Sequence, residues 1–216
     1  MTVSDIITEP FLIHKHVAKE DRCDRVYKLL KLVGLEEYHA ERYPHEFSGG
    51  QRQRICIARA LAVEPEFIVA DEPVSSLDVS IRAQILNLLA DLQKTMGLSF
   101  LYISHDLSSV RQISQRVAVM YLGEIVELAD TDELFDNPLH PYTIAMLQSL
   151  PRLDQAKTWR LQVIGGKSPD PANLPNHCAV LPRCSHRTDV CRFYEPPLLK
   201  QVSPEHSCAC YVRIEK

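Results

Sequence analysis

The sequence lacks any run of about eighteen apolar residues, so it predicts no transmembrane helix. Its first residues, Met-Thr-Val-Ser-Asp, lack a basic stretch followed by an apolar one, and this predicts no secretory signal. Positive charge is not in excess either, because 24 Lys and Arg stand against 28 Asp and Glu, for a net charge of −4. Nucleic acid or an anionic membrane surface is therefore not expected as the main partner. Internal repeats and low-complexity tracts are also absent.

The residues that are present indicate a folded protein with two differently composed parts. Of the 216 residues, 45% are apolar and 24% are charged, which suits one globular domain with a small appendage. Five of the seven cysteines fall between Cys178 and Cys210, where prolines also gather. We therefore predict an α/β part over 1–150 and a loop-rich, cysteine-bearing part over 151–216. Cysteines without a secretion signal indicate a reducing compartment.

Hydrophobic spacing in the first part predicts helices that alternate with short strands. Two continuous apolar runs read as strands that are buried on both faces of a mainly parallel sheet. A later pair of apolar runs around Gly123 reads as a closing hairpin. The alternation predicts a doubly wound α/β arrangement. The expected helices are 17–33, 48–63, 81–92 and 107–113; the expected strands are 67–70, 100–103, 117–121 and 124–128.

Three polar side chains follow the two predicted parallel strands directly. Asp71 and Glu72 come after the first of them, and His105 comes after the second. In open α/β sheets, ligands bind beyond the carboxyl ends of the strands. The sequence therefore predicts that these three side chains face one ligand site.

Four short motifs lie around these residues, and each resembles a motif of ATP-binding cassette (ABC) ATPases. A helix start with two glycines and a Ser-Gln capping box resembles the signature motif. The strand that ends in the acidic pair resembles Walker B, and two further turns resemble the D-loop and the switch histidine. Taken alone, the Ser-Gly-Gly-Gln turn reads equally well as an ordinary helix cap. The four motifs are 47–54, 67–72, 76–78 and 104–106.

The resemblance implies a fold and a set of site residues. It implies a P-loop NTPase domain that binds ATP and Mg²⁺, with Asp71 holding the magnesium ion through its water shell. It further implies that Glu72 orients or deprotonates the attacking water and that His105 senses the γ-phosphate. The residues that the resemblance assigns to nucleotide binding are Ser48, Gly49, Gly50, Gln51, Asp71 and Asp78.

Further segments resemble the oligopeptide/dipeptide importer branch of this family, to which nickel importers also belong. They are 43–47, 71–79, 119–121, 140–143, 169–170 and the cysteine-rich tail. The resemblance implies a head-to-tail dimer with a second ATPase subunit, together with transmembrane permease subunits and an extracytoplasmic solute-binding protein. It places the subunit peripherally on the cytoplasmic face of the inner membrane, where ATP hydrolysis drives import of di- or oligopeptides.

The phosphate cradle G-x-x-x-x-G-K-S/T is missing from these 216 residues. Gly166-Lys167-Ser168 is a decoy, because Leu161 stands where the first glycine belongs and Pro169 follows. The chain resembles the later portion of a family member, beyond Walker A and the glutamine loop. We therefore expect the chain alone to bind ATP weakly and to hydrolyse almost none.

Four cysteines of the tail are candidate metal ligands. Cys178, Cys184 and Cys191 are spaced C-x5-C-x6-C, and Cys210 follows; no C-x2-C pair indicates a zinc ribbon. Four thiolates suit a 4Fe–4S cluster, which some relatives in the resembled branch carry. Zinc, free thiols and disulfides remain the alternatives. Cys208 competes with Cys210 as the fourth ligand, and the resemblance favours Cys210.

A second function from a different class stays open. The chain reads alternatively as a catalytically silent fragment whose tail acts as an iron–sulfur or thiol regulatory module. The missing phosphate cradle favours this interpretation, whereas the presence of Glu72 and His105 argues against a dedicated loss of catalysis.

Overall fold

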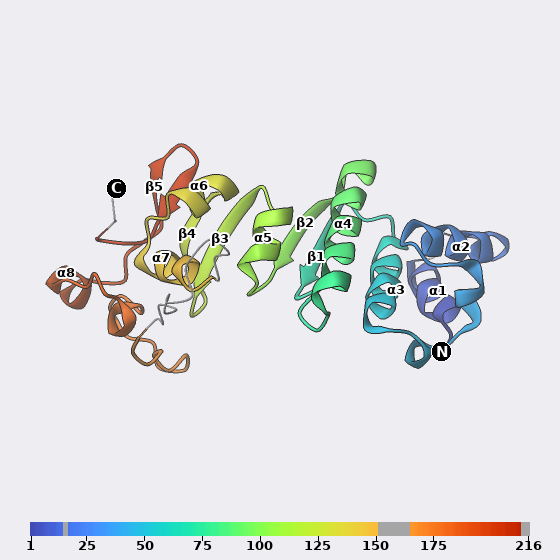
Figure 1. Cartoon of the computed structure of the whole chain (residues 1–216), viewed down its shortest axis with the longest axis horizontal. Coiled ribbons are helices and arrows are strands. Elements are labelled where there is room, and N and C mark those ends of the chain that lie inside the picture. The colour runs from blue at the N-terminus through green and yellow to red at the C-terminus, as the bar shows by residue number, and fades with distance from the viewer. Residues whose placement is uncertain (15–16, 151–164, 213–216) are drawn as a thin grey trace. The chain divides into compact units, whose positions relative to one another are not determined.

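A computed structural model describes residues 1–14, 17–150 and 165–212 of the chain (Figure 1). These residues divide into two compact units, the first over 1–113 and the second over 114–216. Within the described ranges, no helix has the length and apolarity that crossing a lipid bilayer requires. The two units are described separately below.

The first unit contains helices and one small parallel sheet. The expected helix over 17–33 is shorter than predicted, since it starts at Arg22 after a single 3₁₀ turn. The polar segment before the glycine pair holds two further 3₁₀ turns. The elements are α1 (Val3–His14), η1 (Lys19–Asp21), α2 (Arg22–Leu32), η2 (Glu37–Glu41), η3 (Pro44–Glu46), α3 (Gly49–Leu61), β1 (Phe67–Asp71), α4 (Val79–Met96), β2 (Ser99–Ile103) and α5 (Leu107–Ile113).

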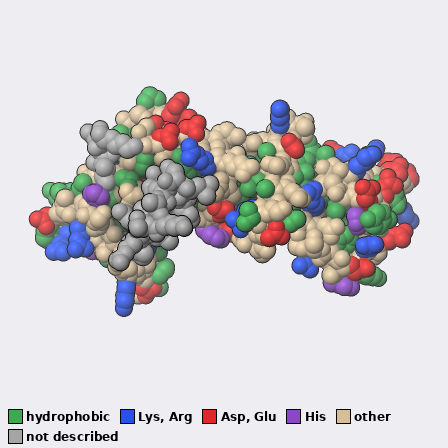
Figure 2. All heavy atoms as spheres, viewed as in Figure 1, with side chains coloured by type: hydrophobic (Ala, Val, Ile, Leu, Met, Phe, Trp, Pro, Cys, Tyr) green, Lys and Arg blue, Asp and Glu red, His purple; other side chains and the backbone are tan. Residues whose placement is uncertain are grey.

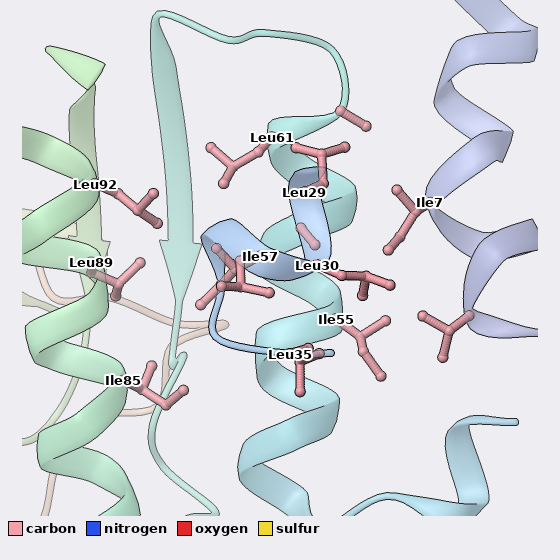
Figure 3. Packing of buried hydrophobic residues seen from close by; sticks show 14 of the residues in the cluster. Ile7, Leu29, Leu30, Leu35, Ile55, Ile57, Leu61, Ile85, Leu89 and Leu92 are labelled. Carbon is pink, nitrogen blue, oxygen red and sulfur yellow. The ribbon is translucent and has the colours of Figure 1, made fainter. Parts of the chain in front are cut away.

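The core of the first unit lies between its helices and one face of the sheet. Figure 3 shows Ile85, Leu89 and Leu92 of α4 directed toward β1. On the other side of the cluster, Leu30 of α2 and Ile7 of α1 pack near each other, and both are fully buried. The recurrence of these residues every three to four positions explains why the helices form and which faces they bury.

Strands β1 and β2 pair in parallel, as the sequence predicts, with Phe67 opposite Ser99 and Asp71 opposite Ile103. The expectation that both faces are buried is wrong for this structure. Phe67 and Val69 are each 55% exposed, whereas Ile68 on the opposite face packs against the core. Leu101 and Ile103 of β2 are likewise 49% and 43% exposed, so this face of the two-stranded sheet is open in the described part of the unit.

The second unit is built on an antiparallel sheet. Its strands follow the order β3-β4-β6-β5, and the predicted hairpin turn forms at Gly123 with φ +87°. The strand β6 adds to β4, so Glu127 lies opposite Cys208. The elements are β3 (Arg116–Tyr121), β4 (Glu124–Asp130), α6 (Thr131–Asp136), α7 (Pro141–Gln148), η4 (Leu181–Arg183), α8 (Asp189–Phe193), β5 (Lys200–Ser203) and β6 (His206–Cys208).

The overall class is α/β, with a small parallel sheet and a larger antiparallel one. The predicted division near residue 150 falls inside the second unit, and the following 151–164 lie outside the described residues. The assignment of 1–150 and 151–216 to two domains stays a prediction.

Charges of both signs are mixed over the surface that Figure 2 shows. Acidic, basic and histidine side chains alternate over the helices of the first unit, and no extended area of one sign stands out on that face. This mixture agrees with the small net charge of −4.

Candidate functional site

The acidic pair stands at the carboxyl end of β1. Asp71 is the last residue of the strand and is exposed. Glu72 follows with φ +48°, in the left-handed region that costs a non-glycine residue roughly 1–3 kcal/mol. Its backbone N–H donates to the carbonyl of Ile103 at 2.9 Å, which continues the parallel ladder for one more residue. The sharp turn therefore directs the Glu72 side chain toward the end of the neighbouring strand.

Glu72 and His105 are in direct contact. The Glu72 Oε1 atom accepts the backbone N–H of His105 at 3.2 Å and lies 2.7 Å from its Nδ1. In the neutral tautomer with the proton on Nδ1, the Nε2 atom is left as the acceptor of the ring. The His105 side chain is 77% exposed and that of Glu72 36% exposed, so both are open to a ligand.

An arginine on α4 connects the turn after β1 to the turn after β2. Arg82 donates from Nη1 to Asp106 Oδ2 at 2.9 Å and from Nη2 to the carbonyl of Leu77 at 3.3 Å. Asp78 begins α4 by accepting the N–H of Ile81 at 2.9 Å. The sequence did not single out Arg82, because its partners belong to two separate turns.

The glycine pair opens α3 as predicted. Ser48 Oγ accepts the N–H of Gln51 at 3.3 Å, and Gln51 Oε1 accepts the N–H of Ser48 at 3.0 Å, which completes the capping box. Gly50 packs so closely on Ile81 that an added Cβ would overlap its Cγ2 atom. A Cβ on Gly49 would lie 3.2 Å from Leu77. The start of α3 therefore lies against the turn that carries Asp78.

Two pairs of predicted site residues are thus brought together, Glu72 with His105 and the α3 start with the Asp78 turn. The Gly-Lys-Ser decoy behaves as predicted. Gly166 has φ +77°, and residues 165–170 form no helix whose N-terminus would hold a phosphate.

The cysteines of the tail surround one cavity in the second unit. Cys178, Cys184, Cys191 and Cys210 all line it. Cys208 does not line it, because this residue sits in β6 opposite Glu127. The structure thus places Cys210 and not Cys208 with the other three. The remaining lining residues are His140, Pro141, Val180, Leu181, His186, Pro197, Tyr211 and Val212.

Burial disfavours the thiolate form of three of the cavity cysteines. Burial raises the pKa of Cys210 to about 12, and burial likewise raises the pKa values of Cys178 and Cys184. Cys210 Sγ donates to the carbonyl of Val212 at 3.1 Å. Over the ranges that the structure describes, no three His, Cys, Asp or Glu side chains form a group that could hold a metal ion.

A buried carboxylate near this cavity, that of Glu127, was not predicted from the sequence. Glu127 on β4 has no exposed surface and accepts the backbone N–H groups of Leu139 at 2.6 Å and His140 at 3.1 Å. Its Oε1 atom also lies 2.7 Å from Nε2 of His206, whose side chain is 1% exposed. Since 79 residues separate the two partners, no local pattern could reveal the pair.

Comparison with known proteins finds similarity to transport ATPases along the chain. Residues 1–75 match the ABC transporter family, and residues 126–191 match the oligopeptide/dipeptide transporter C-terminal region. The oligopeptide transport ATP-binding protein AppF of Bacillus subtilis (strain 168) is 50% identical over 98% of the chain. The dipeptide transport ATP-binding protein DppF of Escherichia coli (strain K12) is 48% identical over 91% of it. The chain spans 64% and 59% of the lengths of these two relatives.

A solved structure agrees with the sequence matches. The ATP-binding cassette MJ0796, in a dimeric post-hydrolysis state bound to ADP and Pi, aligns with a TM-score of 0.54 and 32% identity. The alignment covers 61% of this chain and 57% of that one.

Proposed function

Because this chain belongs to the family of ABC transporter ATP-binding subunits, we propose that it contributes one portion of the ATPase site of a di- or oligopeptide importer. The portion contains the signature turn, the Walker B acids, the D-loop and the switch histidine. The observation that carries the proposal is the contact between Glu72 and His105 at the ends of two adjacent parallel strands. Such a strand edge is where α/β sheets bind their ligands.

The chemistry of the strand edge fits hydrolysis of a nucleoside triphosphate. Asp71 offers an exposed carboxylate at the end of β1, and oxygen ligands of this kind are the ones that Mg²⁺ prefers. A bound Mg²⁺ ion would neutralise charge that develops on the phosphates. Glu72 would orient the attacking water and accept its proton, while His105 would present its ring to a phosphate oxygen. The short Glu72–His105 contact keeps the two groups in register before substrate arrives.

The α3 start is proposed to face a nucleotide held by a second subunit. Its first N–H groups have no partner inside the helix, and the helix dipole favours an anion there. The packing of Gly50 on Ile81 fixes this end of α3 to the Asp78 turn, so both are presented together. The structural neighbour, which is a dimer bound to ADP and Pi, supports a two-subunit site.

The phosphate cradle is proposed to come from outside these 216 residues, which contain no G-x-x-x-x-G-K-S/T sequence. The chain alone is then expected to bind Mg-ATP weakly, because its sequence lacks the motif that surrounds the β- and γ-phosphates. Isothermal titration tests this, and a dissociation constant in the low-micromolar range would contradict it.

Co-expression with an intact relative tests the catalytic assignment. ATPase activity is expected to rise above that of the relative alone, and Glu72→Gln in this chain is expected to remove the increment. The exposed carboxylate Glu124 supplies the matched control, since Glu124→Gln should leave the increment unchanged. An increment that survives Glu72→Gln would overturn the role of this residue.

The expected partners and location follow from the same proposal. Permease subunits would anchor the ATPase at the cytoplasmic face of the inner membrane, and an extracytoplasmic binding protein would deliver the peptide. Co-purification of the permease subunits with a tagged chain from salt-washed membranes tests this. A tagged chain that purifies from these membranes without permease subunits would count against the proposal.

The tail is proposed to bind a metal ion or a 4Fe–4S cluster through Cys178, Cys184, Cys191 and Cys210. Their convergence on one cavity supports this, and four thiolates suit either group. Rotation of the cysteine side chains would have to bring the sulfur atoms together. Absorption spectra and metal analysis of anaerobically purified protein decide between cluster and zinc, and a metal-free sample would exclude both.

The same cavity favours one alternative function, a catalytically silent fragment whose tail is an iron–sulfur or thiol module that regulates an intact ATPase. Co-expression separates the two functions. In the alternative, Cys184→Ser changes the activity of the relative, whereas Glu72→Gln does not.

A further inference from the structure

His140 lies at the cysteine cavity, directly before the start of α7. The residue is 2% exposed and lines the cavity together with Cys178, Cys184, Cys191 and Cys210. It also caps α7, since its Nδ1 atom accepts the N–H of Tyr142 at 3.1 Å. A residue that caps a helix needs only the acceptor, so the other ring nitrogen is available for a second role.

That second nitrogen carries a proton. The Nδ1 atom accepts the N–H of Tyr142 and therefore holds no proton of its own. Because Nδ1 is an acceptor, the single proton lies on Nε2. Within the described part of the chain the structure shows no hydrogen bond that uses it. The ring therefore offers one N–H donor with no assigned partner.

The backbone of His140 is held by the buried carboxylate of Glu127. Glu127 accepts the backbone N–H of His140 at 3.1 Å and that of Leu139 at 2.6 Å. The same carboxylate contacts His206 in β6. Directly after β6, the N–H of Ala209 donates to the carbonyl of Val126 at 2.8 Å, and Cys210 follows. The buried Glu127 side chain thus helps to fix the backbone of His140 and the segment that carries Cys210.

We propose that Nε2–H of His140 donates a hydrogen bond to a sulfur atom in the metal-loaded cavity, which makes His140 a positioning residue of the thiolate site. The inference rests on the proposed metal-binding role of the four cysteines. Each thiol that becomes a ligand loses its proton to solvent, so negative charge builds up in a buried space. A neutral donor stabilises that charge without repelling the cation. Hydrogen bonds of this kind to ligand atoms typically change metal affinity 10- to 100-fold.

Two variants of the same residue separate the cap from the donor. In His140→Asn the side-chain oxygen can replace Nδ1 as the acceptor for Tyr142, but nothing replaces the Nε2 donor. In His140→Gln the amide reaches further and supplies a donor near the place of Nε2, while the cap is lost. A residue that only caps a helix would show the opposite pattern in metal binding.

The experiment titrates Co²⁺ into the full, reduced chain under anaerobic conditions in competition with a chelator. The thiolate-to-cobalt absorption reports occupancy and ligand environment. His140→Asn is expected to weaken Co²⁺ binding about 10- to 100-fold and to shift the charge-transfer band. The Co²⁺ affinity of His140→Gln is expected to stay within about 3-fold of the wild type, because the glutamine amide restores the donor. Equal affinities for Asn and wild type, or a weaker Gln than Asn, would overturn the proposal.

A measurement on the wild type guards against a variant that does not fold. In the Cd²⁺-loaded chain labelled with ¹⁵N-histidine, the Nε2 proton of His140 is expected to exchange slowly with solvent and to show coupling to cadmium. A rapidly exchanging proton refutes the hydrogen bond. Failure of the wild type to bind Co²⁺, or binding that Cys184→Ser leaves unchanged, would refute the thiolate site and this inference together. Neither result bears on the Glu72–His105 site.

Discussion

Removal of the Glu127 carboxylate is the perturbation whose effect the structure predicts most directly. Glu127→Ala leaves the N–H groups of Leu139 and His140, and the ring of His206, without their acceptor. A buried donor left without its acceptor typically costs about 1–3 kcal/mol, so the loss of these three contacts is expected to cost about 3–5 kcal/mol in total. Glu127→Gln keeps one acceptor oxygen but places an amide N–H₂ against a backbone donor, so about 1–3 kcal/mol is expected.

Hydrogen exchange followed by mass spectrometry measures this effect locally, which matters because the chain has two compact units. A loss of about 3 kcal/mol accelerates exchange through local opening by about two orders of magnitude. Peptides over 124–150 and 200–210 are expected to exchange faster in Glu127→Ala, while peptides from 1–113 keep their rates. The control Glu124→Gln changes an exposed carboxylate on the same strand and is expected to stay within about 0.5 kcal/mol.

Two results would refute this reasoning. The first is unchanged exchange over 124–150 and 200–210 in Glu127→Ala, which would mean that the buried contacts contribute little. The second is equal acceleration across both units, which would mean that the substitution acts on global folding and not on the contacts between β4, the turn before α7 and β6.

Three further predictions concern other contacts. Gly50→Ala is expected to lower the free energy of unfolding by about 1–3 kcal/mol in urea titrations, because its Cβ would overlap Ile81; the double variant with Ile81→Ala should recover part of the loss, and full additivity would contradict the clash. A double-mutant cycle of Arg82→Ala and Asp106→Asn is expected to give a coupling energy of at least about 0.5 kcal/mol, and a coupling near zero would show that the 2.9 Å contact contributes nothing. Burial holds the pKa of His140 at about 4, below its unfolded value of 6.5, so the unfolded chain takes up a proton first as the pH falls. The metal-free chain should therefore lose up to about 3 kcal/mol between pH 6.5 and 4, as measured by denaturation at several pH values; His140→Asn should flatten this slope, and an equally steep slope in the variant would exclude His140 as its source.

Much of the first unit could be predicted from the sequence because its signals are local. The Ser48 capping box and the apolar periodicity of α4 each lie within a few residues, and the structure confirms both. The helix α1 was missed, since Pro10 stands inside it and proline is unfavourable in a helix interior. The exposure of Phe67 and Val69 was also missed, because a continuous apolar strand does not reveal how many neighbours its sheet has.

The candidate site could be predicted in its residue types but not in its contacts. Asp71, Glu72 and His105 were identified by their place after two apolar runs, and the structure confirms that Glu72 and His105 meet. The left-handed backbone at Glu72, which directs its side chain, could not be predicted, because glutamate rarely adopts a positive φ. Cys210 is found at the cavity with the other three, whereas the carboxylate of Glu127 depends on a partner 79 residues away.

The pairing of β6 with β4 has a consequence for synthesis of the chain. A ribosome makes β4 long before β6, so the β3-β4 hairpin first has one open edge and Glu127 lacks its contact with His206. The unpaired N–H and C=O groups of an open strand edge can form hydrogen bonds with another nascent chain. The interval before β6 is synthesised is therefore the period in which this strand edge is most open to mispairing.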